Sequence, residues 1–297
     1  MRLSILLSLV ASMAVASDRS KPPVPPGNDP GGVAVAILET GADYTMPAIA
    51  NYLARDGEGE IIGWDVTDND RRPYKSADDL EEVGYMHRGT AMARTVLKRA
   101  KSSRLELIRL DTSDDNEVRK ALSFVAQTPA KIVVLALQSS KASLWATVRD
   151  AMQSDNAKFL LIAAAGEGET DHARIKEHFA PSLDQLDNVV VVTACDSNGN
   201  ALTTADGAPT NADVAVNTEA FTAELLNADM FQFKPEASIA AAEIAAFAAR
   251  LTAKDPRLTP AEIKLAIVSA AKPYSAGDFA LAKSGWIAEP WKHFPNP

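Results

Sequence analysis

The run KFLLIAAAG, Lys158 to Gly166, is apolar from Phe159 to Ala165. A short continuous run of this kind is typical of a strand that is buried on both faces of a parallel sheet. Comparable runs recur at Val33–Leu38, Glu60–Val66, Arg104–Leu110, Lys131–Leu137 and Asn188–Cys195. Together they predict one mainly parallel sheet.

Helix-length segments separate or follow these runs. Thr259 and Pro260 suit the cap and first turn of one of them, and Asp114 and Asp115 lie near the start of another. The segments are Met46–Asp56, the stretch that begins near Gly84, Asp114–Gln127, Ala142–Ser154, Ser238–Leu251 and Thr259–Ala271. The alternation predicts an α/β domain over residues 33–297, with a three-layer, doubly wound architecture.

The N-terminus has the pattern of an export signal. Arg2 precedes the apolar run Leu3–Val10, and Ala14-Val15-Ala16 forms a small-residue cleavage site. The run is shorter than the ~20 residues of a membrane-spanning helix. We expect residues 1–16 to be a signal peptide that is removed on export to the periplasm or the extracellular space. Residues 17–32 are rich in proline and glycine and predict a flexible lead-in.

Charge and composition exclude several function classes. The net charge of −9 offers no basic surface for nucleic acid or anionic lipid. Cys195 is the sole cysteine, so no intrachain disulfide or cysteine-rich metal site is expected. The chain after residue 16 contains no apolar stretch long enough to span a bilayer.

Metal binding has only weak support in the sequence. The four histidines show no i, i+3 or i+4 pairing; they are His87, His172, His178 and His293. Asp65, Asp68 and Asp70 in WDVTDND are candidate calcium ligands, because calcium prefers hard oxygen atoms. A solvated acidic loop is the favoured interpretation of this segment, so we expect no cofactor.

Six segments, in order, carry a resemblance to a known family. VAVAILETGADYTMPAIAN resembles the first catalytic strand and Asp-Thr-Gly turn of the subtilases, the subtilisin-like serine peptidases. HRGTAMART resembles their His-Gly-Thr-His-Val-Ala-Gly helix entrance, and KIVVLALQSS is similar to their substrate-cleft strand. LLIAAAGEGE, FAPSLDQLDNVVVVTACDSNGN and EASIAAAEIAAFAARLTAKDPRLTPAEIKLAIVSAA resemble the oxyanion segment, the next strand and the nucleophile helix with its successor. The resemblance runs from about Val33 to about Ala271 and implies a subtilisin-like fold.

The resemblance also assigns family positions to residues of this chain. The catalytic Asp position falls on Glu39, and the register of Gly89-Thr90 places the catalytic His position on Arg88. The oxyanion Asn position falls on Glu167, while the nucleophile position keeps its serine, Ser238. Three of these four positions are therefore altered.

Those changes are incompatible with the family's chemistry. A serine nucleophile needs a neighbour that accepts its proton, and a guanidinium has only donors. An ionised Glu167 would add negative charge where an oxyanion must form. Instead, Glu39 and Arg88 are suited to an ion pair of bidentate geometry, which Glu167 can join. We hypothesise that the catalytic triad has become a charge-balanced polar network.

Each of these residues also has a simpler interpretation. Ser238 is expected to cap the Ala-rich helix rather than act as a nucleophile. His87 is expected to be a surface or capping histidine. Arg88 and Glu39 can also point into solvent separately, and Glu243 needs a partner if it is buried.

Three functions follow from these alternatives. The leading hypothesis is an exported, catalytically inactive subtilase-fold protein that binds a peptide or protein partner by strand addition or serves as a scaffold. The runner-up is an active serine endopeptidase in which His87 is the base for Ser238 and Glu39 orients it. The third is a non-proteolytic hydrolase that uses Ser238 with another base.

Overall fold

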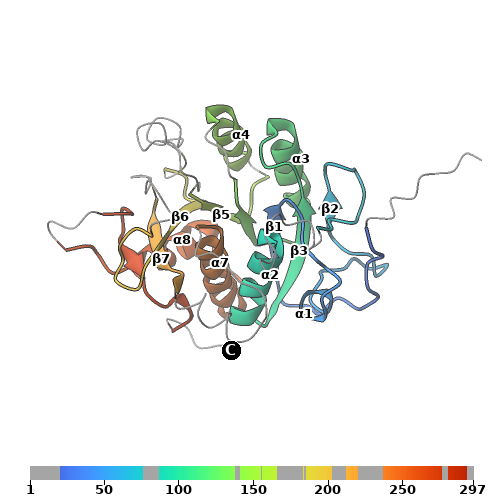
Figure 1. Ribbon diagram of the computed structural model, residues 1–297, viewed down its shortest axis with the longest axis horizontal. Helices are drawn as coiled ribbons and strands as arrows, with labels where there is room; N and C mark the ends of the chain where they lie inside the picture. Colours follow the sequence, from blue (N-terminus) through green and yellow to red (C-terminus); the bar gives the residue numbers. More distant parts are fainter. Residues whose placement is uncertain are drawn as a thin grey trace, which may run out of the picture.

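The apolar runs form one sheet in the part of the chain that the computed structural model describes, which is residues 21–75, 87–137, 141–154, 156–165, 183, 185–202, 212–219, 237–275 and 280–292 (Figure 1). Its strands are β1 (Val33–Glu39), β2 (Trp64–Asp65), β3 (Ser103–Arg109), β4 (Ile132–Leu135), β5 (Leu160–Ala164), β6 (Val189–Cys195), β7 (Val214–Asn217) and β8 (Trp286–Ile287). Their order is β2-β3-β1-β4-β5-β6-β7-β8, and each neighbouring pair is parallel. The predicted parallel sheet is confirmed.

Helices cover both faces of this sheet, as Figure 1 shows. They are α1 (Pro47–Ala50), α2 (Arg88–Arg99), α3 (Asp115–Val125), α4 (Ala142–Met152), α7 (Ala237–Lys254), α8 (Pro260–Ser269) and the short 3-10 turn η2 (Pro290–Lys292). α2, α7 and α8 lie on one face, and α3 and α4 lie on the other. The three-layer α/β architecture is therefore as predicted.

Each face of the sheet has its own hydrophobic core. In β1, Val35 and Ile37 belong to the core beneath α2 and α7, whereas Ala36 and Leu38 belong to the core beneath α3 and α4. This alternation follows from the two-residue period of a strand, and it explains why the runs are apolar throughout. α7 is buried nearly all round, as its Ala-rich sequence indicates.

Some elements differ from the prediction. α1 ends at Ala50 because the chain then turns along β3, where Leu105 donates to the Tyr52 carbonyl and Ala54 donates to the Leu105 carbonyl. β2 is short because Arg55 pairs with Ile61, which withdraws the first half of the expected strand from the sheet. The sequence analysis did not predict β7 or β8.

The helix caps agree better with expectation. Asp114 accepts hydrogen bonds from the backbone N–H groups of Asn116 and Glu117 at the start of α3. Thr259 and Glu262 form a reciprocal capping box at the start of α8, with Pro260 in its first turn. These signals are local, so neighbouring residues suffice to predict them.

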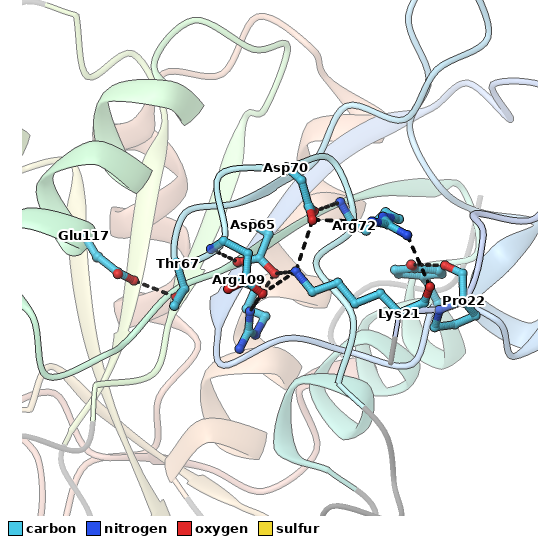
Figure 2. A network of polar contacts seen from close by, with 10 residues as sticks. Lys21, Pro22, Asp65, Thr67, Asp70, Arg72, Arg109 and Glu117 are labelled. Carbon is cyan, nitrogen blue, oxygen red and sulfur yellow. Dashed lines mark hydrogen bonds and ion pairs between the residues drawn. The ribbon is translucent and has the colours of Figure 1, made fainter. Parts of the chain in front are cut away.

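Residues 21–32, called the N-terminal strap below, are docked on the domain and are not the flexible lead-in expected from their composition. At one end, Lys21 Nζ lies 2.5 Å from carboxylate oxygens of Asp65 and Asp68 and 3.3 Å from Asp70 Oδ2 (Figure 2). At the other end, Asp29 accepts hydrogen bonds from the Arg55 N–H, at 2.8 Å, and from the Arg104 guanidinium, at 2.7 Å. Partners distant in sequence thus replace the apolar surface that the strap lacks.

The middle of the strap is held through its backbone carbonyls. The Tyr44 hydroxyl donates to the Pro22 carbonyl at 2.6 Å, and Arg55 Nη2 donates to the Pro25 carbonyl at 2.6 Å. Prolines restrict the unfolded chain, so docking a proline-rich segment costs little additional backbone entropy. The strap therefore runs between the two ends of β3 along one margin of the sheet.

Candidate functional site

Glu39 and Arg88 meet at the carboxyl edge of the sheet. Glu39 is the last residue of β1, and Arg88 is the first residue of α2. β1 lies between β3 and β4, so the chain leaves it toward one side of the sheet and later crosses to the other. Such a switch point is where open α/β sheets usually bind ligands.

Gly89 and Thr90 hold the start of α2 against the turn after β1. A Cβ atom on Gly89 would lie 2.1 Å from the Gly41 carbonyl oxygen, so only glycine allows this approach. The Asp43 N–H donates to Thr90 Oγ1 at 2.8 Å. The Gly-Thr pair thus has a structural role: it fixes the distance between Glu39 and Arg88.

The Glu39 carboxylate and the Arg88 guanidinium form an ion pair. Arg88 Nε donates to Glu39 Oε1 at 2.7 Å, and Arg88 Nη2 bonds the same oxygen. Glu39 is only 1 % exposed, while the Arg88 side chain is 16 % exposed. The idea that both residues point separately into solvent is wrong. The expected fork between two oxygens is also absent, since both guanidinium nitrogens converge on Oε1.

Thr40 occupies the second oxygen of Glu39. Its backbone N–H and its hydroxyl both donate to Glu39 Oε2, the hydroxyl at 2.7 Å. The carboxylate therefore receives donors on both oxygens, which satisfies a buried anion without a histidine.

His87 is the N-cap residue of α2, although its side chain makes no cap hydrogen bond, and at 7 % exposure it is buried and not the surface histidine that was expected. Its Nε2 lies 2.9 Å from Thr40 Oγ1. Because the Thr40 hydroxyl gives its single proton to Glu39, it accepts from His87 and assigns the imidazole proton to Nε2. His87 Nδ1 has no hydrogen-bond partner.

The surroundings of His87 favour the neutral imidazole. Burial lowers its pKa, Glu39 opposes this effect, and the positive charges of Arg88 and Lys75 add to it. The Gly41 backbone also opposes the lowering, and a buried, uncharged ring results. His87 therefore contacts Glu39 only through Thr40, and neither of its nitrogens hydrogen-bonds Ser238.

Ser238 is the second residue of α7 and is 1 % exposed. Since α7 begins at Ala237, the serine lies inside the first turn and is not the N-cap that was expected. α7 packs beside α2. Glu167 lies outside the described residues, so its proposed contact with Arg88 has no structural description.

A second buried ion pair joins α2 to α7. Arg99 Nε lies 3.1 Å from Glu243 Oε1, and both side chains are buried. This contact supplies the partner that Glu243 requires. Arg250 lies one heptad after Glu243 and is buried nearby; burial and the charge of Arg99 lower its pKa, against the effect of Glu243. Charged residues seven apart in an apolar helix were the sequence signal for this cluster.

The acidic turn is not the solvated loop that was favoured. Asp65 is fully buried, and all three carboxylates lie within 3.3 Å of Lys21 Nζ; Figure 2 shows those of Asp65 and Asp70. Arg109 Nη1 also contacts Asp65 at 2.7 Å and Asp68 at 2.8 Å. Lys21 and Arg109 are therefore the cations that these candidate ligands contact in this structure.

No group of three or more His, Cys, Asp or Glu side chains in the described ranges is arranged to hold a metal ion. Among those same residues, no helix combines the length and apolar character needed to cross a membrane.

Solved structures with the same fold are distant in sequence. A cold-adapted subtilisin-like serine proteinase matches at a TM-score of 0.60 and 17 % identity, covering 89 % of this chain and 90 % of that one. MycP1 with its N-terminal propeptide removed matches at 0.60 and 16 %, with coverages of 89 % and 90 %. MycP1 from Mycobacterium smegmatis matches at 0.57 and 16 %, with coverages of 89 % and 79 %.

Sequence comparisons give a sharper result. No curated protein sequence matches this chain. The model of the subtilase family, however, matches residues 31–286, which include β1, α2 and α7 with Glu39, Arg88 and Ser238. The chain belongs to the subtilase family.

Proposed function

We propose that this protein is an exported subtilase-fold protein without peptidase activity, which acts as a binding or scaffold module. One observation carries the proposal: Arg88, at the position that the family resemblance gives to the catalytic histidine, is ion-paired with Glu39 at the catalytic Asp position. An arginine in a salt bridge cannot accept the proton of a serine.

The burial of the site supports the same function. A nucleophile, its base and the base's orienting group must form a connected set. Ser238 and Glu39 are both buried, and the Glu39 carboxylate is already saturated by Arg88 and Thr40. The site is therefore organised as a satisfied polar network that strengthens the junction of β1 and α2.

The partner class follows from the fold and the charge. A subtilase-fold cleft, even one partly blocked by side chains, can hold a peptide or a loop of a partner protein by strand addition. The net charge of −9 disfavours nucleic acid and anionic lipid as partners. Export rests on the signal-like pattern of residues 1–16.

Fluorophosphonate labelling of the purified mature protein tests the inactive assignment. We expect no covalent labelling under conditions in which an active subtilisin-type enzyme is labelled completely. Ser238→Ala should behave like the wild type, and Ser143→Ala, at an exposed position of α4, is the matched control. Labelling that disappears in Ser238→Ala and persists in Ser143→Ala would overturn the proposal.

One observation favours the runner-up, a working serine endopeptidase. His87, Thr40 and Glu39 form a hydrogen-bonded chain that orients the imidazole and leaves Nδ1 available as an acceptor. In this alternative His87 Nδ1 receives the Ser238 proton after a local shift of α2. His87→Gln separates the two functions, because labelling that depends on His87 supports the peptidase only.

A further inference from the structure

Glu106 is a fully buried acid in the middle of β3, far from the residues discussed as the site. Its side chain is 0 % exposed, and neither carboxylate oxygen has a hydrogen-bond partner. It faces the core beneath α3, beside Ala36 of β1. A buried carboxylate without donors is costly, so the environment favours the protonated form.

Few polar groups surround Glu106. Arg104 lies two residues earlier on β3 and therefore on the same face. Asp29 of the N-terminal strap is the other charged neighbour, and Thr128, after α3, is the nearest hydroxyl. Thr128 donates its proton to the Val125 carbonyl.

Arg104 is engaged with the strap. Its Nη1 donates to Asp29 Oδ1 at 2.7 Å, while its Nε is buried without a partner. The one cation near Glu106 in the described surroundings thus serves the carboxylate that anchors the far end of the strap. Glu106 is the other acid on this side of β3, and unlike Asp29 it is fully buried.

We propose that Glu106 controls the docking of the N-terminal strap through its protonation state, by competing with Asp29 for Arg104. When Glu106 is neutral, Arg104 serves Asp29 alone and the strap is docked. When Glu106 loses its proton, Arg104 moves toward the new buried charge and the contact with Asp29 weakens.

The two acids titrate in separate ranges. Burial raises the pKa of Glu106 to about 7, while Thr128 and Arg104 act in the opposite direction and Asp29 adds to the rise. For Asp29, burial alone would raise the pKa, but hydrogen bonds from the Arg55 N–H, Arg104 and the Gly31 N–H hold it below its usual range. Asp29 therefore stays ionised while Glu106 changes charge near neutrality.

Ionisation of Glu106 is expected to loosen only the end of the strap that Asp29 anchors. Without Arg104, Asp29 is held only by the backbone N–H groups of Gly31 and Arg55, so these two hydrogen bonds open more often, while Lys21 stays within its own carboxylates. Hydrogen exchange of the Gly31 and Arg55 amides reports on this anchor directly.

Protection factors for these two amides, measured on the mature protein, test the proposal. Between about pH 5.5 and about pH 8.5 they should fall roughly tenfold in the wild type, the loss of one charge-assisted hydrogen bond. In Glu106→Gln, a neutral isostere of the protonated acid, they should stay high at both pH values. Glu243→Gln is the matched control, because that buried acid pairs with Arg99 on the other face, and it should keep the wild-type response.

A second variant tests whether the response to pH depends on the guanidinium of Arg104. Arg104→Gln should give low protection at both pH values and no response to pH. Unchanged protection in the wild type, an identical fall in Glu106→Gln, or a fall of the same size in Arg104→Gln would overturn the proposal.

Discussion

At the scale of single residues, Glu39 and Arg88 form a buried ion pair at the two positions that the family resemblance gives to the catalytic Asp and His. The carboxylate stays buried because donors reach both of its oxygens. A proton cannot move along this contact, since the guanidinium stays charged at any pH compatible with folding. In the proposed function, this contact therefore has a structural role and no part in proton transfer.

Removing the Arg88 guanidinium should therefore destabilise the protein. Arg88→Ala leaves Glu39 buried without its counterion, and we expect a loss of about 3 kcal/mol in the free energy of unfolding, measured by urea denaturation. Arg119→Ala, at an exposed position of α3, is the control and should change this value by less than about 0.5 kcal/mol. Equal effects of the two substitutions would contradict the role of the pair.

Glu106 predicts how stability depends on pH. Its pKa is raised from 4.5 to about 7 in the folded protein, so the fold binds the proton more tightly than the unfolded chain does. Stability is then full below about pH 4.5 and falls as the pH rises through about 7, by an amount on the order of 3 kcal/mol. Glu106→Gln should remove this decline, so that it is more stable than the wild type at about pH 8.5 and similar to it at about pH 4.5. If urea denaturation shows the same decline in stability with rising pH for the wild type and for Glu106→Gln, Glu106 is not its cause.

At the residue scale, the sequence predicted a contact correctly where its alignment with the family motif was clear. Gly89-Thr90 fixed the register that predicted the contact of Arg88 with Glu39. It failed for His87, whose burial and contact with Thr40 depend on the packing of the turn after β1 against α2. It also missed Lys21, because its carboxylate partners lie more than forty residues away.

At the scale of elements, the entrance of α2 is fixed by a backbone contact with the turn after β1. Gly89→Ala would place a methyl group within 2.1 Å of the Gly41 carbonyl oxygen, so the helix or the turn must shift. We expect a loss of about 2 kcal/mol in the free energy of unfolding, as for other overpacked positions. Gly57→Ala, where a Cβ atom would meet nothing within 4 Å, should be close to neutral. A neutral Gly89→Ala would show that the close approach does not constrain α2.

The elements that sequence predicted well are those with a strong pattern of their own. β1, β5 and β6 fall within about two residues of their apolar runs, because burial on both faces favours apolar residues at nearly every position. The missed strands β7 and β8 are short and pair at the end of the sheet, so their sequence carries little periodicity. Their existence depends on neighbours supplied by the rest of the fold.

At the scale of the whole molecule, the strap links opposite ends of β3 to the N-terminal part of the chain. Lys21 is anchored beside Arg109 at the carboxyl end of β3, and Asp29 is anchored by Arg104 at its amino end. This two-point attachment lies on the same margin of the sheet as the short strand β2. The strap therefore stabilises a margin that β2 covers for only two residues.

The acidic turn leads to a prediction about calcium. Lys21 and Arg109 already neutralise Asp65, Asp68 and Asp70, so a divalent ion would have to displace a buried ammonium. We expect the melting temperature of the wild type to be unchanged by a chelator or by added calcium. A clear rise with calcium would show that these carboxylates bind the ion despite Lys21.

Lys21→Met tests the strap as a structural part of the whole domain. The substitution keeps the apolar stem of the side chain but removes the ammonium, which leaves buried Asp65 with Arg109 as its remaining cation. We expect the free energy of unfolding to fall by about 3 kcal/mol, because one partner of a buried charge cluster is lost. Lys120→Met, at an exposed position of α3, should have almost no effect. If calcium restores the stability of Lys21→Met but leaves the wild type unchanged, the lysine is the cation that completes the acidic turn; equal stability of the two variants would instead mean that the strap contributes little to the fold.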